Sequence, residues 1–184
     1  GMVVGTGDMS ENAQGWCTNN GDQMSMFNPN TSIPKTLVRH LVRWYADRRA
    51  SDEMKPVLAE AAVQRVSPEL KKGTDGGMQA TDDTLGPDDL RDFFLYHQNR
   101  RREDPSKTGY LAVKAFEGVY SKDEIGHWLS TYLSRYTSSQ WKRDVMPNGP
   151  KIGTVSLSPR GDLRIAPNTS QGWFGTPGTT AARV

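Results

Sequence analysis

The chain has 184 residues, of which 35% are hydrophobic, so it is large enough for one domain but should have a small core for its length. Its 23 Lys and Arg residues against 21 Asp and Glu give a net charge of +2, which argues against nucleic-acid binding. One cysteine rules out an internal disulfide framework, and no apolar run approaches the ~20 residues that span a membrane. With no signal-peptide pattern, we expect a soluble, cytoplasmic protein.

A turn-rich run at residues 5–22 concentrates glycines, carboxylates and amides. Val3-Val4 predicts the end of a buried strand, and the Gly5-Thr6-Gly7 turn would let a phosphate approach backbone N–H groups. Ser10 and Glu11 then open a short predicted helix, whose first turn favours an anion, and Glu11 is a candidate ligand for Mg²⁺. A plain structural turn explains the same residues equally well.

An amphipathic helix is predicted next, with a start signal at residues 31–34. Its apolar positions recur on one helical face: Leu37, Val38, Leu41, Val42 and Tyr45. Lys35 lies in the first turn, where the helix dipole disfavours a cation, so it is either a solvated lysine or a binding residue. A second helix is predicted from Asp52 or Glu53 to about Gln64.

Three more helices are predicted after a glycine-rich, mobile loop at residues 71–80. One starts at Pro87, one runs over 107–120, and the longest follows the capping box of Ser121 and Glu124. A last helix ends near Lys142, which as a lysine would pair favourably with a helix carboxyl terminus. The chain then looks extended, and residues 167–184 read as an extended or disordered tail.

The order of motifs is more informative than any single one. The run GTGDMSENAQGWCTNNGDQ at residues 5–23, followed by FNPNTSIPKTLVRHLVRW at 27–44, closely resembles the second half of the synthetase domain of glutamine-dependent NAD⁺ synthetases, which are N-type ATP pyrophosphatases. The likeness continues through SPEL, QATDDTLGP, DFFLYH, QWKRDVMPNGPKIG and VSLSPRGDLR. Residues 1–166 are thus expected to be the carboxyl-terminal portion of such a domain.

The resemblance implies a truncated portion of a Rossmann-like α/β domain that is mainly helical, with few short strands. It also implies a two-step reaction, in which ATP adenylates deamido-NAD and ammonia released from glutamine displaces AMP to give NAD⁺. Family members carry an SGG-x-DS loop for the ATP phosphates and a nitrilase-like domain, and this sequence contains neither. We therefore expect the isolated chain to be inactive and to form a homo-oligomer or to pair with a complementing amino-terminal half.

Site residues also follow from the resemblance, position by position. Thr6, Lys35 and Ser67 would contact ATP, Glu11 would bind Mg²⁺ or deamido-NAD, and Asp22 would orient or deprotonate the incoming ammonium as the catalytic residue. The deamido-NAD site would be lined by Trp16, Cys17, Thr18 and Asn19, with Lys142 near the nicotinate carboxylate. The alternatives are a non-catalytic helical interaction module or relic of the synthetase, and a simple nucleotide-binding module.

Overall fold

The computed structural model describes residues 1–21, 23–64 and 81–169. Over these ranges the fold is helical and has no β-strand, in keeping with the predicted helix-rich fold. Its elements in chain order are α1 (Met9–Gln14), α2 (Lys35–Arg48), α3 (Met54–Val63), α4 (Thr81–Leu85), α5 (Asp88–Leu95), the π-helix η1 (Tyr96–Arg100), α6 (Pro105–Ala115), α7 (Lys122–Ser138) and α8 (Gln140–Asp144).

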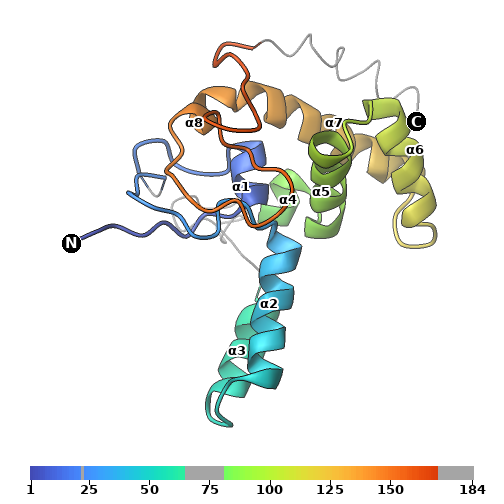
Figure 1. The fold of residues 1–184 in the computed structure, drawn as a ribbon. Helices are drawn as coiled ribbons and strands as arrows, with labels where there is room; N and C mark the ends of the chain where they lie inside the picture. The colour runs from blue at the N-terminus through green and yellow to red at the C-terminus, as the bar shows by residue number, and fades with distance from the viewer. Residues whose placement is uncertain (22, 65–80, 170–184) are drawn as a thin grey trace, which may run out of the picture.

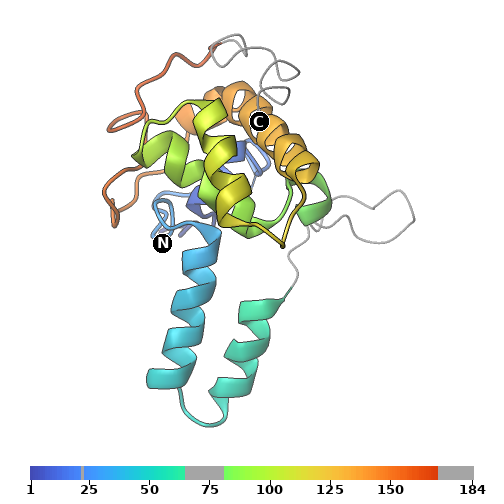
Figure 2. The same cartoon turned by 90° about the vertical axis from the view of Figure 1, so that its right-hand side faces the viewer.

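The helices divide into a body and an arm. Figure 1 shows α1 and α4 to α8 gathered together, while α2 and α3 project away from them as an antiparallel pair. The view turned by 90° shows the same separation (Figure 2). Among the described residues, the amino-terminal end of α2 contacts the body, at α1 and α5.

The core lies in the body, where α5 and α6 pack on α7, and α1 packs against α5 and α7. The predicted capping box is confirmed, because Ser121 and Glu124 each bond the other's backbone N–H at the start of α7. The apolar stripe of α7 is likewise confirmed as core, together with residues from α1, α5 and α6: Met9, Ala13, Leu90, Phe94, Ala112, Ile125, Leu129, Tyr132, Leu133 and Tyr136.

Three segments lie side by side in place of strands. Val4 and Phe27 form one isolated parallel bridge, and Phe27 and Asn148 form another. The predicted buried strand end at Val3-Val4 is wrong, since these side chains are 55% and 52% exposed. Their backbone pairs with the segment around Phe27, but about half of each side chain stays exposed.

Two further predictions are corrected. The helix expected over 107–120 ends at Ala115, because Gly118 turns the chain at a φ of +79°, and Val119 is left 65% exposed. On α2, the expected buried face splits: Leu37, Leu41 and Tyr45 are 40–48% exposed, whereas Val38 and Val42 are partly covered. No helix in the described ranges is long and apolar enough to cross a membrane.

Candidate functional site

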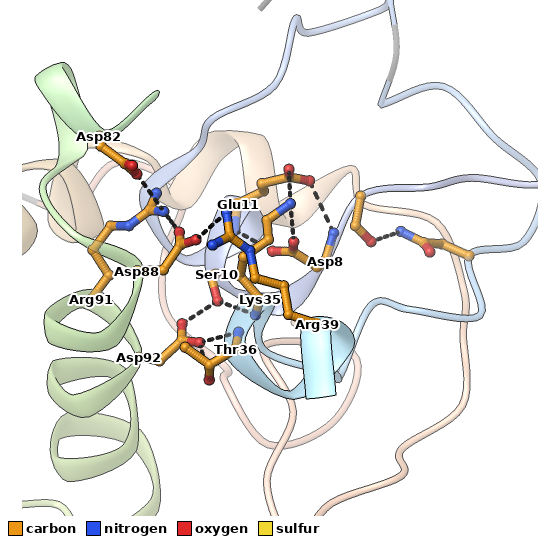
Figure 3. Close-up of polar contacts among 12 residues, drawn as sticks. Asp8, Ser10, Glu11, Lys35, Thr36, Arg39, Asp82, Asp88, Arg91 and Asp92 are labelled. Atoms are coloured by element: carbon orange, nitrogen blue, oxygen red, sulfur yellow. Dashed lines mark hydrogen bonds and ion pairs between the residues drawn. The ribbon is translucent and has the colours of Figure 1, made fainter. Parts of the chain in front are cut away.

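A charged cluster lies where α1, α2 and α5 meet, and Lys35 is its centre (Figure 3). The Lys35 ammonium lies 2.6 Å from Oδ2 of Asp8 and 2.8 Å from Oε1 of Glu11. The two carboxylates also hold each other in place, since Asp8 Oδ1 accepts from the Glu11 N–H at 2.9 Å and Glu11 Oε2 accepts from the Asp8 N–H at 3.0 Å. This capping box fixes both carboxylates at the start of α1.

The start of α2 is capped by other elements. Pro34, the residue before the helix, has no side chain that can accept a hydrogen bond. Side chains of α1 and α5 cap the helix instead. Ser10 Oγ accepts from the Lys35 N–H at 2.9 Å, and Asp92 Oδ2 accepts from the Thr36 N–H and hydroxyl at 2.8 and 2.7 Å. Ser10 in turn donates to Asp92. Three helix segments are thereby fixed relative to one another at the cluster.

A second set of charges borders the cluster on its α5 side. Arg91 is buried and pairs with Asp88, with Asp82 of α4 at 3.8 Å. Arg39 of α2 also reaches Asp88, at 2.8 Å. Burial lowers the pKa of Arg91, while the surrounding carboxylates act in the opposite direction.

The environment shifts the titration of the central groups. Burial raises the pKa of the Glu11 carboxyl and nearby Asp8 adds to this, against the opposing effect of Lys35. Burial also raises the pKa of Asp92, although its bonds from Ser10 and Thr36 oppose that shift. For Lys35 burial acts to lower the pKa, but the two carboxylates outweigh it and the pKa is raised. The lysine therefore stays charged, with two anions as partners.

A second group of predicted residues lies at the carboxyl end of α1. The ammonium of Lys142 donates to the backbone oxygens of Gly15 at 2.9 Å and Cys17 at 2.7 Å. Gly15 caps α1 with a φ of +60°, and a side chain there would collide with Ser139. Arg135 lies over the ring of Trp16, 5.1 Å from its centroid. Lys142 thus holds the backbone of the loop that begins at Gly15.

Buried Arg143 ties the same region to α7. Its guanidinium donates to the backbone oxygen of Ala13 at 2.6 Å, to Gln140 Oε1 at 2.9 Å and to the backbone oxygen of Tyr136. It also stacks over the Tyr136 ring at 4.4 Å. Both ends of α1, and with them Glu11, are therefore fixed by buried polar contacts.

The structure places the predicted site residues in two groups. Glu11 and Lys35 are in direct contact, whereas Trp16, Cys17 and Lys142 lie together at the other end of α1. Thr18 and Asn19 continue that loop, and Thr6 is exposed just before the capping box. Asp22 and Ser67 lie outside the described residues, as do the loop at 71–80 and residues 170–184.

The glycine turn departs from the expected phosphate cradle. The Gly5 N–H donates to the Phe27 backbone oxygen at 2.7 Å, so it is already used in the parallel bridge. A side chain at Gly5 would come within 2.5 Å of Ser25 Oγ, so close packing accounts for this glycine. At the start of α1, the Asp8 carboxylate takes the place expected for an anion.

Sequence reasoning missed Asp8, Ser10 and Asp92. The Asp8 to Glu11 spacing is that of a capping box, so this signal was present in the sequence. Asp92 lies 82 residues from Ser10, and nothing local indicates that contact.

The acids of the cluster suit a cation that is shared with a bound phosphate. Among the described residues, no group of three or more His, Cys, Asp and Glu side chains is arranged to hold a metal ion. Mg²⁺, however, commonly takes one or two protein carboxylates and completes its shell with phosphate oxygens and water. Asp8 and Glu11 provide such a pair. A separate hollow of about 270 Å³ is lined by Thr31 and by residues 146–151, 156–158 and 160–162, and none of the predicted site residues borders it.

Comparison with known proteins gives a consistent result. Residues 1–69 match the family model described as NAD synthase. The chain is 38% identical over 190 residues to the glutamine-dependent NAD(+) synthetase of Mycobacterium bovis, and 39% identical over 192 residues to that of Mycobacterium leprae. Each alignment covers 92% of this chain. The chain belongs to the NAD synthase family.

The chain corresponds to only part of the length of its NAD synthase relatives. It spans 28% of the length of the two mycobacterial relatives. The crystal structure of a glutamine-dependent NAD(+) synthetase from Cytophaga hutchinsonii superposes with a TM-score of 0.73 at 17% identity, over 98% of this chain and 26% of that one. At that identity the structural likeness concerns the fold, and it extends over almost the whole chain.

Proposed function

We propose that the chain is one part of an NAD⁺ synthetase active site, which adenylates deamido-NAD with ATP and then amidates it with ammonia to give NAD⁺. The observation that carries this proposal is the Asp8, Glu11 and Lys35 cluster in a chain of the NAD synthase family. It supplies a cation for phosphate oxygens and two carboxylates for Mg²⁺ from adjoining helix starts.

In the reaction, the nicotinate carboxylate attacks the α-phosphorus of ATP and pyrophosphate leaves; ammonia then attacks the acyl carbon and AMP leaves. Bound Mg²⁺ would neutralise charge on the phosphates. Asp8 and Glu11 would bind the Mg²⁺ ion, and Lys35 would then contact phosphate oxygens in place of these two carboxylates. Lys142 would hold the loop of Trp16 to Asn19 against the dinucleotide, in addition to the predicted contact with the nicotinate carboxylate.

The chain alone is expected to be inactive. We propose that it belongs to a parallel α/β domain of Rossmann type, whose remaining strands and ATP loop come from another part of the enzyme. The two parallel bridges that align Val4, Phe27 and Asn148 support this proposal, since they set three backbone segments in the order of a parallel sheet. The reaction depends on holding ATP and deamido-NAD in the right geometry, so it fails when the groups that bind the other phosphate oxygens are missing.

The test is product formation from deamido-NAD, ATP, Mg²⁺ and ammonia. The chain is assayed alone and mixed with a separately produced amino-terminal half of a synthetase domain that carries the SGG-x-DS loop. We expect AMP and NAD⁺ from the mixture and from neither piece alone. Absence of product in the mixture, with both pieces folded, would contradict the proposal.

A second candidate is a non-catalytic interaction module that keeps the family fold. The bare apolar surface of the arm favours it, because such surfaces mark protein contacts. It predicts partner binding with no product in the mixed assay, so the same experiment separates the two candidates.

A further inference from the structure

Another cavity, of about 180 Å³, is lined by η1, the end of α7, α8 and residues of the segment 163–169. None of its lining residues belongs to the cluster around Lys35 or to the loop that Lys142 holds. Pockets for drug-sized molecules usually measure ~300–1,000 Å³, so this cavity suits a smaller ligand. Two arginines from different parts of the chain line it, Arg102 after η1 and Arg143 in α8.

Arg143 is a buried cation whose hydrogen-bond partners are neutral. It is 2% exposed, and it donates to the backbone oxygens of Ala13 and Tyr136 and to the side-chain oxygen of Gln140. The neighbouring acid Asp144 accepts instead from the Gln140 amide, at 3.0 Å. Buried charges are normally paired, because an isolated one is costly to remove from water. Among the described residues, however, no carboxylate forms an ion pair with this guanidinium.

Arg102 reaches the cavity from a backbone conformation that is unusual for an arginine. Its φ is +57°, in the left-handed region that glycine adopts at little cost and other residues adopt rarely. Residues held in such conformations cluster at binding and catalytic sites. In the described part of the chain, Arg102 forms no ion pair, whereas neighbouring Arg101 lies 3.7 Å from Glu103. The charge of Arg102 is therefore available to a ligand.

The two arginines lie near the same phenol. Burial raises the pKa of Tyr136, and the charges of Arg143 and Arg102 oppose this shift. The Tyr136 hydroxyl itself donates to Asn99 of η1 at 2.6 Å. Turns of π-helix such as η1 are frequent at functional sites. Two positive charges thus border one small cavity beside a π-helical turn.

One carboxylate that lines the cavity, Glu103, is already paired. It contacts Nδ1 of His97, and the ammonium of Lys107 lies 3.1 Å away. The hydrogen bond from His97 lowers the pKa of Glu103, and Lys107 adds to this shift. Because these partners balance its charge, Glu103 does not serve as the missing counter-ion of the two arginines.

We propose that this cavity binds a small oxyanion of the phosphate type between the guanidinium groups of Arg102 and Arg143. Guanidinium groups match phosphate oxygens in both geometry and charge. A tetrahedral dianion presents oxygens in several directions, so arginines from two elements can bind it together, whereas a planar carboxylate presents one pair. The anion would supply the counter-charge that Arg143 lacks. This site does not rest on the proposed role in NAD⁺ synthesis.

The test is isothermal titration calorimetry of the whole chain with sodium phosphate, without Mg²⁺ and at an ionic strength held constant with sodium chloride. We expect a Kd of ~1 mM or lower, similar binding of sulfate, and roughly 10-fold weaker binding of acetate. Arg102→Ala removes one guanidinium and should weaken phosphate binding roughly 10-fold or more. Arg100→Ala is the matched control, because it removes the same charge from an exposed residue outside the cavity, and it should bind as the wild type does.

Two further variants separate this site from effects on folding and from the cluster around Lys35. Thr169→Glu places a carboxylate at the edge of the cavity without altering the core, so it should weaken phosphate binding by a similar factor. Lys35→Met should leave the affinity unchanged. The proposal would be overturned by a wild type that does not bind phosphate, by equal affinities of Arg102→Ala and Arg100→Ala, by unchanged binding in Thr169→Glu, or by binding that requires Lys35.

Discussion

The two ends of α2 are built from the same helical periodicity but held in different ways. Its first turn is fixed by polar contacts from α1 and α5, through Ser10, Asp92 and the pair of acids around Lys35. Its later turns carry large apolar side chains that stay well exposed, such as Leu41 at 43% and Trp44 at 46%. Charged and polar contacts are therefore concentrated at the root of the arm, and exposed apolar side chains lie along its length.

The largest effect is expected from removing the shared cap at the root. Asp92→Ala strips the Thr36 N–H and hydroxyl and the Ser10 hydroxyl of their acceptor, so we expect a loss of about 3 kcal/mol in the free energy of unfolding. Urea denaturation measures this free energy. Asp47→Ala, at an exposed position of α2, is the control. Equal losses in the two variants would show that Asp92 does not link α1, α2 and α5.

The second largest loss of stability is expected from removing the charge of Lys35. Lys35→Met leaves Asp8 and Glu11 uncompensated, and we expect a loss of about 2 kcal/mol at pH 7. Lys55→Met, at an exposed ion pair on α3, should cost under ~0.5 kcal/mol.

The effect of Lys35→Met should depend on pH with a defined sign. The pKa of Glu11 is raised in the folded state, so the folded state binds its proton more readily than the unfolded chain does. The stability that comes from protonating Glu11 is thus fully present at pH values below the unfolded pKa of about 4.5 and is lost as pH rises through the folded pKa. In Lys35→Met, protonation of Glu11 removes the charge that the missing lysine no longer balances. The loss of unfolding free energy in this variant should therefore shrink as pH falls from 7 toward 4, and a constant loss would contradict the pairing.

A smaller gain is expected within the body. Gln14 is fully buried, and neither polar atom of its amide has a hydrogen-bond partner among the described residues. Gln14→Leu keeps the volume and removes this cost, so we expect thermal unfolding to report about 1 kcal/mol of added stability. Asn99→Leu is the matched control, because Asn99 accepts from the Tyr136 hydroxyl at 2.6 Å and its replacement should destabilise the fold.

The smallest effect is expected at the exposed apolar residues of α2. Leu41→Ala, at a position 43% exposed, should change the free energy of unfolding by less than ~0.5 kcal/mol. Leu129→Ala, in the core of the body at 1% exposure, should cost about 2–5 kcal/mol. Similar losses in the two variants would mean that the arm is packed against something in the monomer.

The helices were largely predictable because their signals are local. The stripe and capping box of α7 depend on residues three or four apart, and they located both its start and its buried face. Lys35 was also identifiable locally, as a cation at the wrong end of a helix dipole. The family resemblance assigned Lys35 to ATP and Glu11 to Mg²⁺ or deamido-NAD as separate residues, and their direct contact comes from the structure.

What escaped prediction depends on contacts distant in sequence. Periodicity showed that α2 is amphipathic, but the width of its apolar surface hid the split between a packed seam and a bare face. Asp92 reaches α2 across 56 residues, so no local pattern reveals it as the cap of Thr36. The Gly5 turn was ambiguous for the same reason, since the partner of its N–H, Phe27, lies in another segment.

The most direct test of the cluster at the root of the arm compares Lys35→Met with Lys55→Met in the mixed assay for NAD⁺ formation. If Lys35 serves the phosphates, its variant should lower kcat/KM for ATP by roughly 100-fold or more while folding as shown by circular dichroism, and Lys55→Met should match the wild type. Equal activity of the two variants would contradict the assignment of this cluster as the phosphate and Mg²⁺ site.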